Sequence, residues 1–147
     1  MKILSIPNEN GKMTCFWEEG ASSGKKPLII CLADKEEDAQ RDLNLLFSQA
    51  NGASVAALVV YPQTEEQIVG DWLYSLRQRE DVDENRITLT GTLSAADWVW
   101  RLGSHFPQWF AGICAVGGYG DPYEVRAMKN VPVRAYLVEE EPQIIRK

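Results

Sequence analysis

Ser94 and His105 are the two side chains whose types and positions could together perform nucleophilic chemistry. Ser94 lies in Thr88–Trp100, a segment whose pattern predicts a strand that turns tightly into a helix. A serine at such a turn can attack a carbonyl carbon when a histidine accepts its proton. His105 is the only histidine in the 147-residue sequence, and a helix would place it about 16 Å from the turn. We therefore expect His105 to interact with carbonyls at the helix C-terminus, and Ser94 to be an N-terminal helix residue.

The remaining clusters of polar residues have simpler structural interpretations, although metal binding stays an alternative for the acidic ones. The acidic run at 35–38 predicts the first turn of a helix, the run at 139–141 a solvated strand end, and Gly117–Gly120 a turn. The three cysteines lie in apolar runs without metal-ligand spacing, which predicts free core thiols: Cys15, Cys31 and Cys114. We predict no catalytic, cofactor-binding or metal-binding residues.

The composition argues against two classes of partner. The formal charge is −6 and the sequence has no basic run, so the electrostatic footprint of nucleic-acid binding is absent. No segment has the roughly 20 apolar residues of a membrane span, and the N-terminus has too short an apolar run for a signal peptide. We expect a cytoplasmic protein that forms one domain over residues 1–147.

Alternating strand and helix patterns predict the elements around the turn. Four apolar runs predict strands that are buried on both faces, as in a parallel sheet: Pro27–Ala33, Ser54–Tyr61, Arg86–Gly91 and Ala111–Val116. Between them, apolar residues at helical spacing predict three helices. The first two begin with N-caps at Asp34 and Thr64, and the third spans about 94–106 until Pro107 stops it.

Weaker signals extend this pattern at both ends of the sequence. Met1–Ile6 and Met13–Glu18 predict a hairpin across an Asn-Gly turn, and Val131–Val138 predicts one more strand. Core packing is expected for the tryptophans of the second and third helices and for Trp109, with a surface patch for a partner as the alternative. The whole pattern predicts an α/β fold, a three-layer sandwich with a mostly parallel sheet and helices on both faces.

The order of these landmarks resembles the α/β-hydrolase superfamily, in particular the dienelactone-hydrolase-like esterases and predicted peptidases. The resemblance is carried by Asp83–Gly91, by a helix that ends in His105–Pro107, and by two later segments, Gly117–Pro122 and Lys129–Val133. It holds without a gap from Asp83 to about Glu141. The resemblance implies a shortened hydrolase fold with an active site at the strand-to-helix turn.

The turn departs from the Gly-x-Ser-x-Gly motif of that family, in which the serine is exposed at a strained elbow. With the register fixed by Gly91, Trp100 and Pro107, the nucleophile position falls on Leu93 and the second glycine on Ala95. A shift by one residue would select Ser94 but would spoil the match elsewhere. A leucine cannot attack a carbonyl carbon.

The other parts of the family's machinery also depart from its pattern. The segment that supplies oxyanion donors reads Ala33-Asp34, whose charge would oppose a developing oxyanion. The triad acid falls on Glu141. The triad histidine would lie beyond this acid, and the sequence stops at Lys147 without one.

We therefore expect an α/β-hydrolase-like protein without serine-hydrolase activity that acts in binding or assembly. It would form a homodimer, through an open edge at Val131–Val138 or through helices that mask the sheet. A small molecule or another protein could be its partner. The alternatives are a small esterase with unconventional catalytic groups, one completed by a histidine from another chain, or a fragment of a longer hydrolase.

Overall fold

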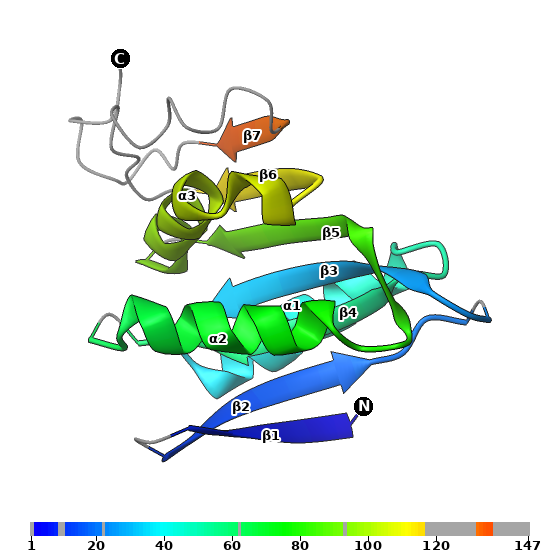
Figure 1. Ribbon diagram of the computed structural model, residues 1–147, viewed down its shortest axis with the longest axis horizontal. Coiled ribbons are helices and arrows are strands. Elements are labelled where there is room, and N and C mark those ends of the chain that lie inside the picture. The colour runs from blue at the N-terminus through cyan, green and yellow to red at the C-terminus, as the bar shows by residue number, and fades with distance from the viewer. Residues whose placement is uncertain are drawn as a thin grey trace.

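The computed structural model describes residues 2–8, 11–21, 23–61, 63–92, 94–116 and 132–136, without the side chains at 5–8, 11–13, 94, 116 and 133–136. This part of the chain forms a seven-stranded sheet with helices on both faces (Figure 1). The elements in chain order are β1 (Lys2–Asn8), β2 (Gly11–Glu18), β3 (Lys26–Ala33), α1 (Glu36–Ser48), β4 (Ser54–Val59), α2 (Glu66–Arg77), β5 (Val82–Thr92), α3 (Ser94–His105), the 3₁₀ helix η1 (Pro107–Trp109), β6 (Gly112–Val116) and β7 (Val133–Tyr136).

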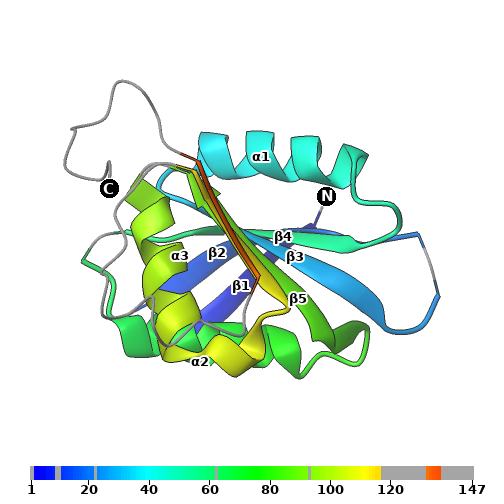
Figure 2. The same ribbon diagram turned by 90° about the horizontal axis from the view of Figure 1, so that it is seen from above.

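The sheet is parallel over most of its width. The strand order is β1-β2-β4-β3-β5-β6-β7, and the five strands from β4 to β7 run parallel. The hairpin of β1 and β2 joins the sheet antiparallel to β4. In Figure 2, α1 covers one face of the sheet while α2 and α3 cover the other. The predicted fold class is therefore confirmed.

Residue alternation in the central strands explains why their sequences are apolar throughout. In β3, Leu28, Ile30 and Leu32 belong to the core between the sheet and α2 and α3. Cys31 and Ala33 belong to a second core beneath α1. Successive side chains of a strand point to opposite faces, so a strand covered by helices on both faces needs an apolar residue at every position. The prediction of burial on both faces is confirmed for β3, and also for β4, where all six residues are buried.

The same prediction is wrong for β5, which has one fully buried face. Ile87 and Leu89 are buried, whereas Thr88 and Thr90 on the other face are only half-buried. The reason is that α1 packs on β2, β3 and β4, while α3 covers β5 from the opposite side. Threonine suits this position because its β-branched side chain fits a half-buried strand.

Both predicted helix N-caps are one residue too early. The N-cap of α1 is Lys35 instead of Asp34, and the N-cap of α2 is Glu65 instead of Thr64; neither residue makes a side-chain capping bond. The Thr64 hydroxyl accepts a hydrogen bond from the Tyr61 amide at 3.3 Å, so it serves the preceding turn. Acidic residues in the first turns instead stabilise the helix dipoles, as expected for the run at 35–38.

The other predicted elements are found close to their expected positions. The N-terminal hairpin is confirmed, although residues 9 and 10 of its turn lie outside the described residues. α3 ends at His105, two residues before Pro107 opens η1. Trp72 and Trp98 are core residues, and Trp100 and Trp109 are partly buried against the same core. No helix in the described ranges is both long and apolar enough to span a membrane.

Candidate functional site

The strand-to-helix turn predicted from the sequence is present. β5 ends at Thr92 and α3 begins at Ser94, so a single residue separates them. That residue is Leu93, which lies outside the described residues. Ser94 is the first residue of α3, as expected for an N-terminal helix residue, and its side chain is not described.

Gly91 shows how closely the strand and helix pass at this turn. A Cβ atom built on Gly91 would lie 2.9 Å from Val99 Cγ2 and 3.0 Å from the carbonyl oxygen of Ala95. Both contacts come from α3, so the absence of a side chain lets the helix pack on the end of β5. Gly91 therefore allows the same close approach of strand and helix that the first glycine of a nucleophile elbow allows.

Asp34 lies at the same edge of the sheet as this turn. β3 and β5 are adjacent parallel strands, and Leu32 pairs with Gly91 near their carboxyl ends. Asp34 follows the last residue of β3 and is half-buried. The structure therefore brings a carboxylate to the strand end nearest the turn, where an acyl-transfer enzyme needs hydrogen-bond donors.

His105 lies at the opposite end of α3 from Ser94, as the helix length predicts. Its Nδ1 atom is 2.7 Å from Oε2 of Glu66, at the beginning of α2. Nε of Arg101 is 3.9 Å from the other oxygen of the same carboxylate. The histidine therefore contributes to the contact between α2 and α3, a long-range pairing that its sequence position does not reveal.

Two of the three predicted free thiols, Cys15 and Cys31, are not poised to react. Cys15 and Cys31 are buried, and burial raises the pKa of each thiol to about 12, so both are protonated at neutral pH. Cys114 is only half-buried, unlike the core thiol expected. No cluster of metal-ligating side chains occurs among the described residues. Gly117–Gly120 and Glu139–Glu141 lie outside them.

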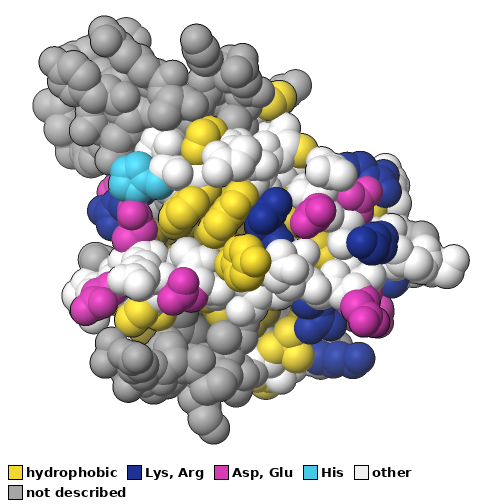
Figure 3. All heavy atoms as spheres, viewed as in Figure 1, with side chains coloured by type: hydrophobic (Ala, Val, Ile, Leu, Met, Phe, Trp, Pro, Cys, Tyr) yellow, Lys and Arg dark blue, Asp and Glu magenta, His cyan; other side chains and the backbone are white. Residues whose placement is uncertain are grey.

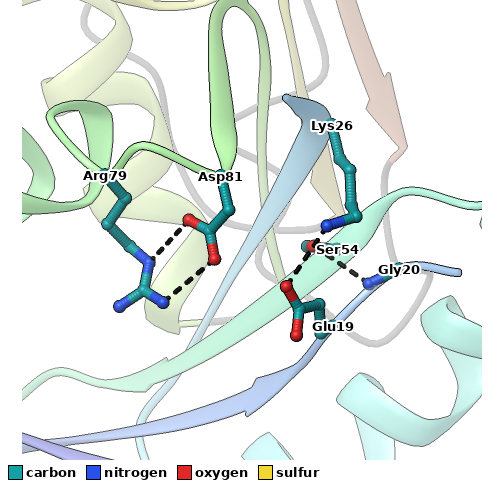
Figure 4. A network of polar contacts seen from close by, with 6 residues as sticks. All are labelled: Glu19, Gly20, Lys26, Ser54, Arg79 and Asp81. Carbon is teal, nitrogen blue, oxygen red and sulfur yellow. Dashed lines mark hydrogen bonds and ion pairs between the residues drawn. The ribbon is translucent and has the colours of Figure 1, made fainter. Parts of the chain in front are cut away.

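A polar network that sequence reasoning missed lies at the other end of the sheet, where β3 and β5 begin (Figure 4). The Arg79 guanidinium donates two hydrogen bonds to the Asp81 carboxylate, at 3.0 and 3.1 Å. Lys26, only 6% exposed, donates to Glu19 at 3.2 Å through its ammonium group. Its backbone amide donates to the Asp81 carbonyl. These contacts join the beginnings of β3 and β5 to the end of β2, so we assign the network a structural role.

The ion pair between Arg79 and Asp81 predicts a specific loss of stability in acid. The hydrogen bonds from Arg79 lower the pKa of Asp81 below its ordinary value of 3.8, against the opposing effect of burial. The pair therefore stabilises the fold above about pH 4, and this stabilisation is lost as the pH falls through the folded-state pKa. We expect the wild type to lose more free energy of unfolding between about pH 4 and pH 2 than Asp81→Asn does, measured by urea denaturation.

Asp83→Asn is the matched control for this measurement. The Asp83 carboxylate also accepts a hydrogen bond, at 2.8 Å, from Arg86, and this bond lowers its pKa. The Arg86 side chain is 59% exposed, so solvent screens the pair and a smaller change is expected. If the free energy of unfolding of Asp81→Asn fell with pH as steeply as that of the wild type, the ion pair between Arg79 and Asp81 would not be the source of the acid sensitivity.

Comparison with known proteins identifies the fold of this chain. No protein-family model matches the sequence, and no curated protein matches it. Among solved structures, a thermostable esterase superimposes with a TM-score of 0.79 at 17% identity, over 98% of this chain and 47% of the esterase. This chain has an α/β-hydrolase fold. The fold expected from the resemblance is therefore confirmed over most of the chain.

Other hydrolases share the α/β-hydrolase fold at similar distance in sequence. The 2,6-dihydroxy-pseudo-oxynicotine hydrolase has a TM-score of 0.66 at 15% identity, over 88% of this chain and 42% of that enzyme. The S-formylglutathione hydrolase from Staphylococcus aureus has a TM-score of 0.63 at 8% identity, over 88% of this chain and 65% of that enzyme. The chain thus spans about half the length of the first two hydrolases.

Proposed function

We propose that this α/β-hydrolase-fold protein binds or assembles with a partner and does not hydrolyse esters through a serine nucleophile. The observation that carries the proposal is the single residue between the end of β5 and the start of α3. In a nucleophile elbow this position holds the attacking oxygen, sulfur or carboxylate. Here the residue is Leu93, whose side chain has no nucleophilic atom.

Two further features support the absence of acyl-transfer chemistry. Asp34 brings a half-buried carboxylate to the strand end beside the turn, and a negative charge there raises the energy of an oxyanion transition state. His105 contacts Glu66 at the far end of α3, too distant to accept a proton at the turn. The residues of a triad act as one unit, so losing several of them removes the shared rate enhancement.

A fluorophosphonate probe and short-chain nitrophenyl esters test this proposal on the purified chain. We expect no covalent labelling, and turnover at least about 10⁴-fold below that of a serine hydrolase with the same fold. Ser94→Ala and Thr92→Val are matched variants, since each removes one hydroxyl beside Leu93. Labelling of the wild type and of Thr92→Val that is lost in Ser94→Ala would overturn the proposal.

A second candidate is a hydrolase completed by another polypeptide, favoured by the 47% share of the thermostable esterase that this chain covers. In this case the partner must supply a nucleophile as well as a histidine, because position 93 is leucine. This candidate is tested by purifying the untagged protein from its natural source together with any bound polypeptide. Native mass spectrometry then identifies the second chain, and fluorophosphonate labelling shows whether that chain carries a reactive serine. A labelled serine on a second chain would favour it over a binding protein.

A further inference from the structure

A partly exposed aromatic patch lies on the outer side of α2 and η1, and we call it the α2–η1 patch: Asp71, Tyr74, Arg77, Phe106 and Trp109. The rings of Phe106 and Trp109 stack with centroids 4.2 Å apart, and the Tyr74 ring lies 6.1 Å from Trp109. Tyr74 is 51% exposed. Figure 3 shows hydrophobic side chains gathered in the middle of this face, beside a basic one.

Arg77 distinguishes this patch from the rest of the described surface. Its guanidinium lies 5.2 Å from the centre of the Trp109 ring, and its Nε is buried without a hydrogen-bond partner. The other arginines whose side chains the structure describes each pair with a carboxylate: Arg41, Arg79, Arg86 and Arg101. No carboxylate among the described residues pairs with the Arg77 guanidinium, so a carboxylate on a partner can pair with its terminal nitrogens, although the buried Nε is out of its reach.

Asp71 offers such a carboxylate on the same helix. It is exposed, and within the described ranges it forms no ion pair. Asp71 and Arg77 lie three residues before and after Tyr74. At about 100° and 1.5 Å per residue, they flank Tyr74 by about 60° and about 4.5 Å on either side. The patch therefore carries a cation and an anion placed symmetrically about an exposed aromatic residue.

We propose that the α2–η1 patch binds a second copy of this chain. Two α2 helices cross antiparallel about a two-fold axis at Tyr74, which puts Asp71 of one protomer level with Arg77 of the partner subunit. A two-fold interface makes this ion pair twice, and Tyr74 and Trp109 supply the aromatic anchors that dominate many interfaces. The proposal does not rest on the proposed function, because it uses none of the residues at the turn between β5 and α3.

Charge complementarity favours a second copy over a different partner. Each chain carries a formal charge of −6, so two copies repel at long range, but salt screens this repulsion beyond about 8 Å. Local pairing of opposite charges then decides which surfaces can meet. The α2–η1 patch contains its own complement, whereas an unrelated partner would need matching charges of its own.

Charge reversal tests the proposal by sedimentation equilibrium of the full chain at several salt concentrations. Asp71→Arg and Arg77→Glu each place like charges together at both copies of the pair, so each should weaken dimerisation about 100-fold. The double variant restores opposite charges and should recover to within about 10-fold of the wild type. Salt screens both the attraction within the ion pairs and the repulsion between the two negative chains, so the variants are compared with the wild type at each salt concentration.

Control variants separate the patch from general surface effects. Tyr74→Glu should abolish the dimer. Tyr61→Glu and Leu45→Glu are the controls, because these residues are similarly exposed, at 49% and 57%, but lie outside the patch, so both variants should still dimerise. Circular dichroism establishes that each variant is folded. If Tyr74→Glu does not fold, the charge-reversal variants alone test whether the patch forms the dimer. A monomeric wild type at about 100 µM, a dimer that tolerates both single reversals, or a double variant that stays monomeric would each overturn the proposal.

Discussion

Gly91→Ala is expected to lower the free energy of unfolding by about 2 kcal/mol, because the added methyl group has no space. It would lie 2.9 Å from Val99 Cγ2 and 3.0 Å from the Ala95 carbonyl oxygen. The second contact is with helix backbone, so relief requires α3 to move away from the end of β5. Urea denaturation followed by circular dichroism measures the loss.

Gly112→Ala in the adjacent strand β6 is the matched control. A methyl group there would come no closer than 3.4 Å, to the Pro132 carbonyl oxygen, which is an ordinary contact. Replacing a glycine without steric conflict reduces the entropy of the unfolded chain, so this variant should be neutral or slightly stabilised. Equal stability of the two variants would contradict the close packing of α3 on β5 and weaken the register that assigns Leu93 to the elbow.

Gly20→Ala is expected to have the larger effect of the two, a loss of about 3 kcal/mol or more. A methyl group on Gly20 would overlap the carbonyl oxygen of Gly52, and it would lie 2.8 Å from the carbonyl carbon of Ala53. All these atoms belong to backbone, which yields less easily than a flexible side chain. Displacement of Gly20 would also break the hydrogen bond from its amide to the buried Ser54 hydroxyl, 3.0 Å long (Figure 4).

Thermal and urea unfolding of Gly20→Ala and Gly24→Ala check this prediction. Gly24 has a positive φ of 77° and no atom within 4 Å of an added Cβ. Its replacement should therefore cost only the strain of the left-handed backbone, about 1 kcal/mol. If Gly20→Ala were no less stable than Gly24→Ala, the contact between Gly20 and the loop before β4 would be looser than the structure shows.

Local sequence patterns predicted the elements well because burial repeats along each element. The apolar runs of β3 and β4 and the helical spacing in α1, α2 and α3 gave the correct types and nearly correct ends. Pro107 ended α3 as predicted, because proline cannot continue a helix. These signals depend on residues within about four positions of each other, so the sequence contains them completely.

The predictions that failed depended on contacts with other parts of the molecule. Thr64 was assigned to a helix cap, but its hydroxyl bonds the Tyr61 amide of the preceding turn. The prediction that β5 is buried on both faces is wrong because α1 packs on β2, β3 and β4 and does not extend over β5. A local sequence pattern for capping or burial does not show which of several possible partners a side chain contacts in the folded protein.

In the candidate site, too, some features follow from the sequence and others only from the tertiary structure. The absence of a nucleophilic atom at Leu93 follows from the sequence, because the chemical group at a position is a property of the residue alone, and the register that gives Leu93 the nucleophile position remains a proposal. The closeness of α3 to Gly91, the pairing of His105 with Glu66, and the meeting of Tyr74, Arg77 and Trp109 were decided only by tertiary structure. Each joins residues from different elements, and packing of those elements against the sheet determines which of their side chains meet.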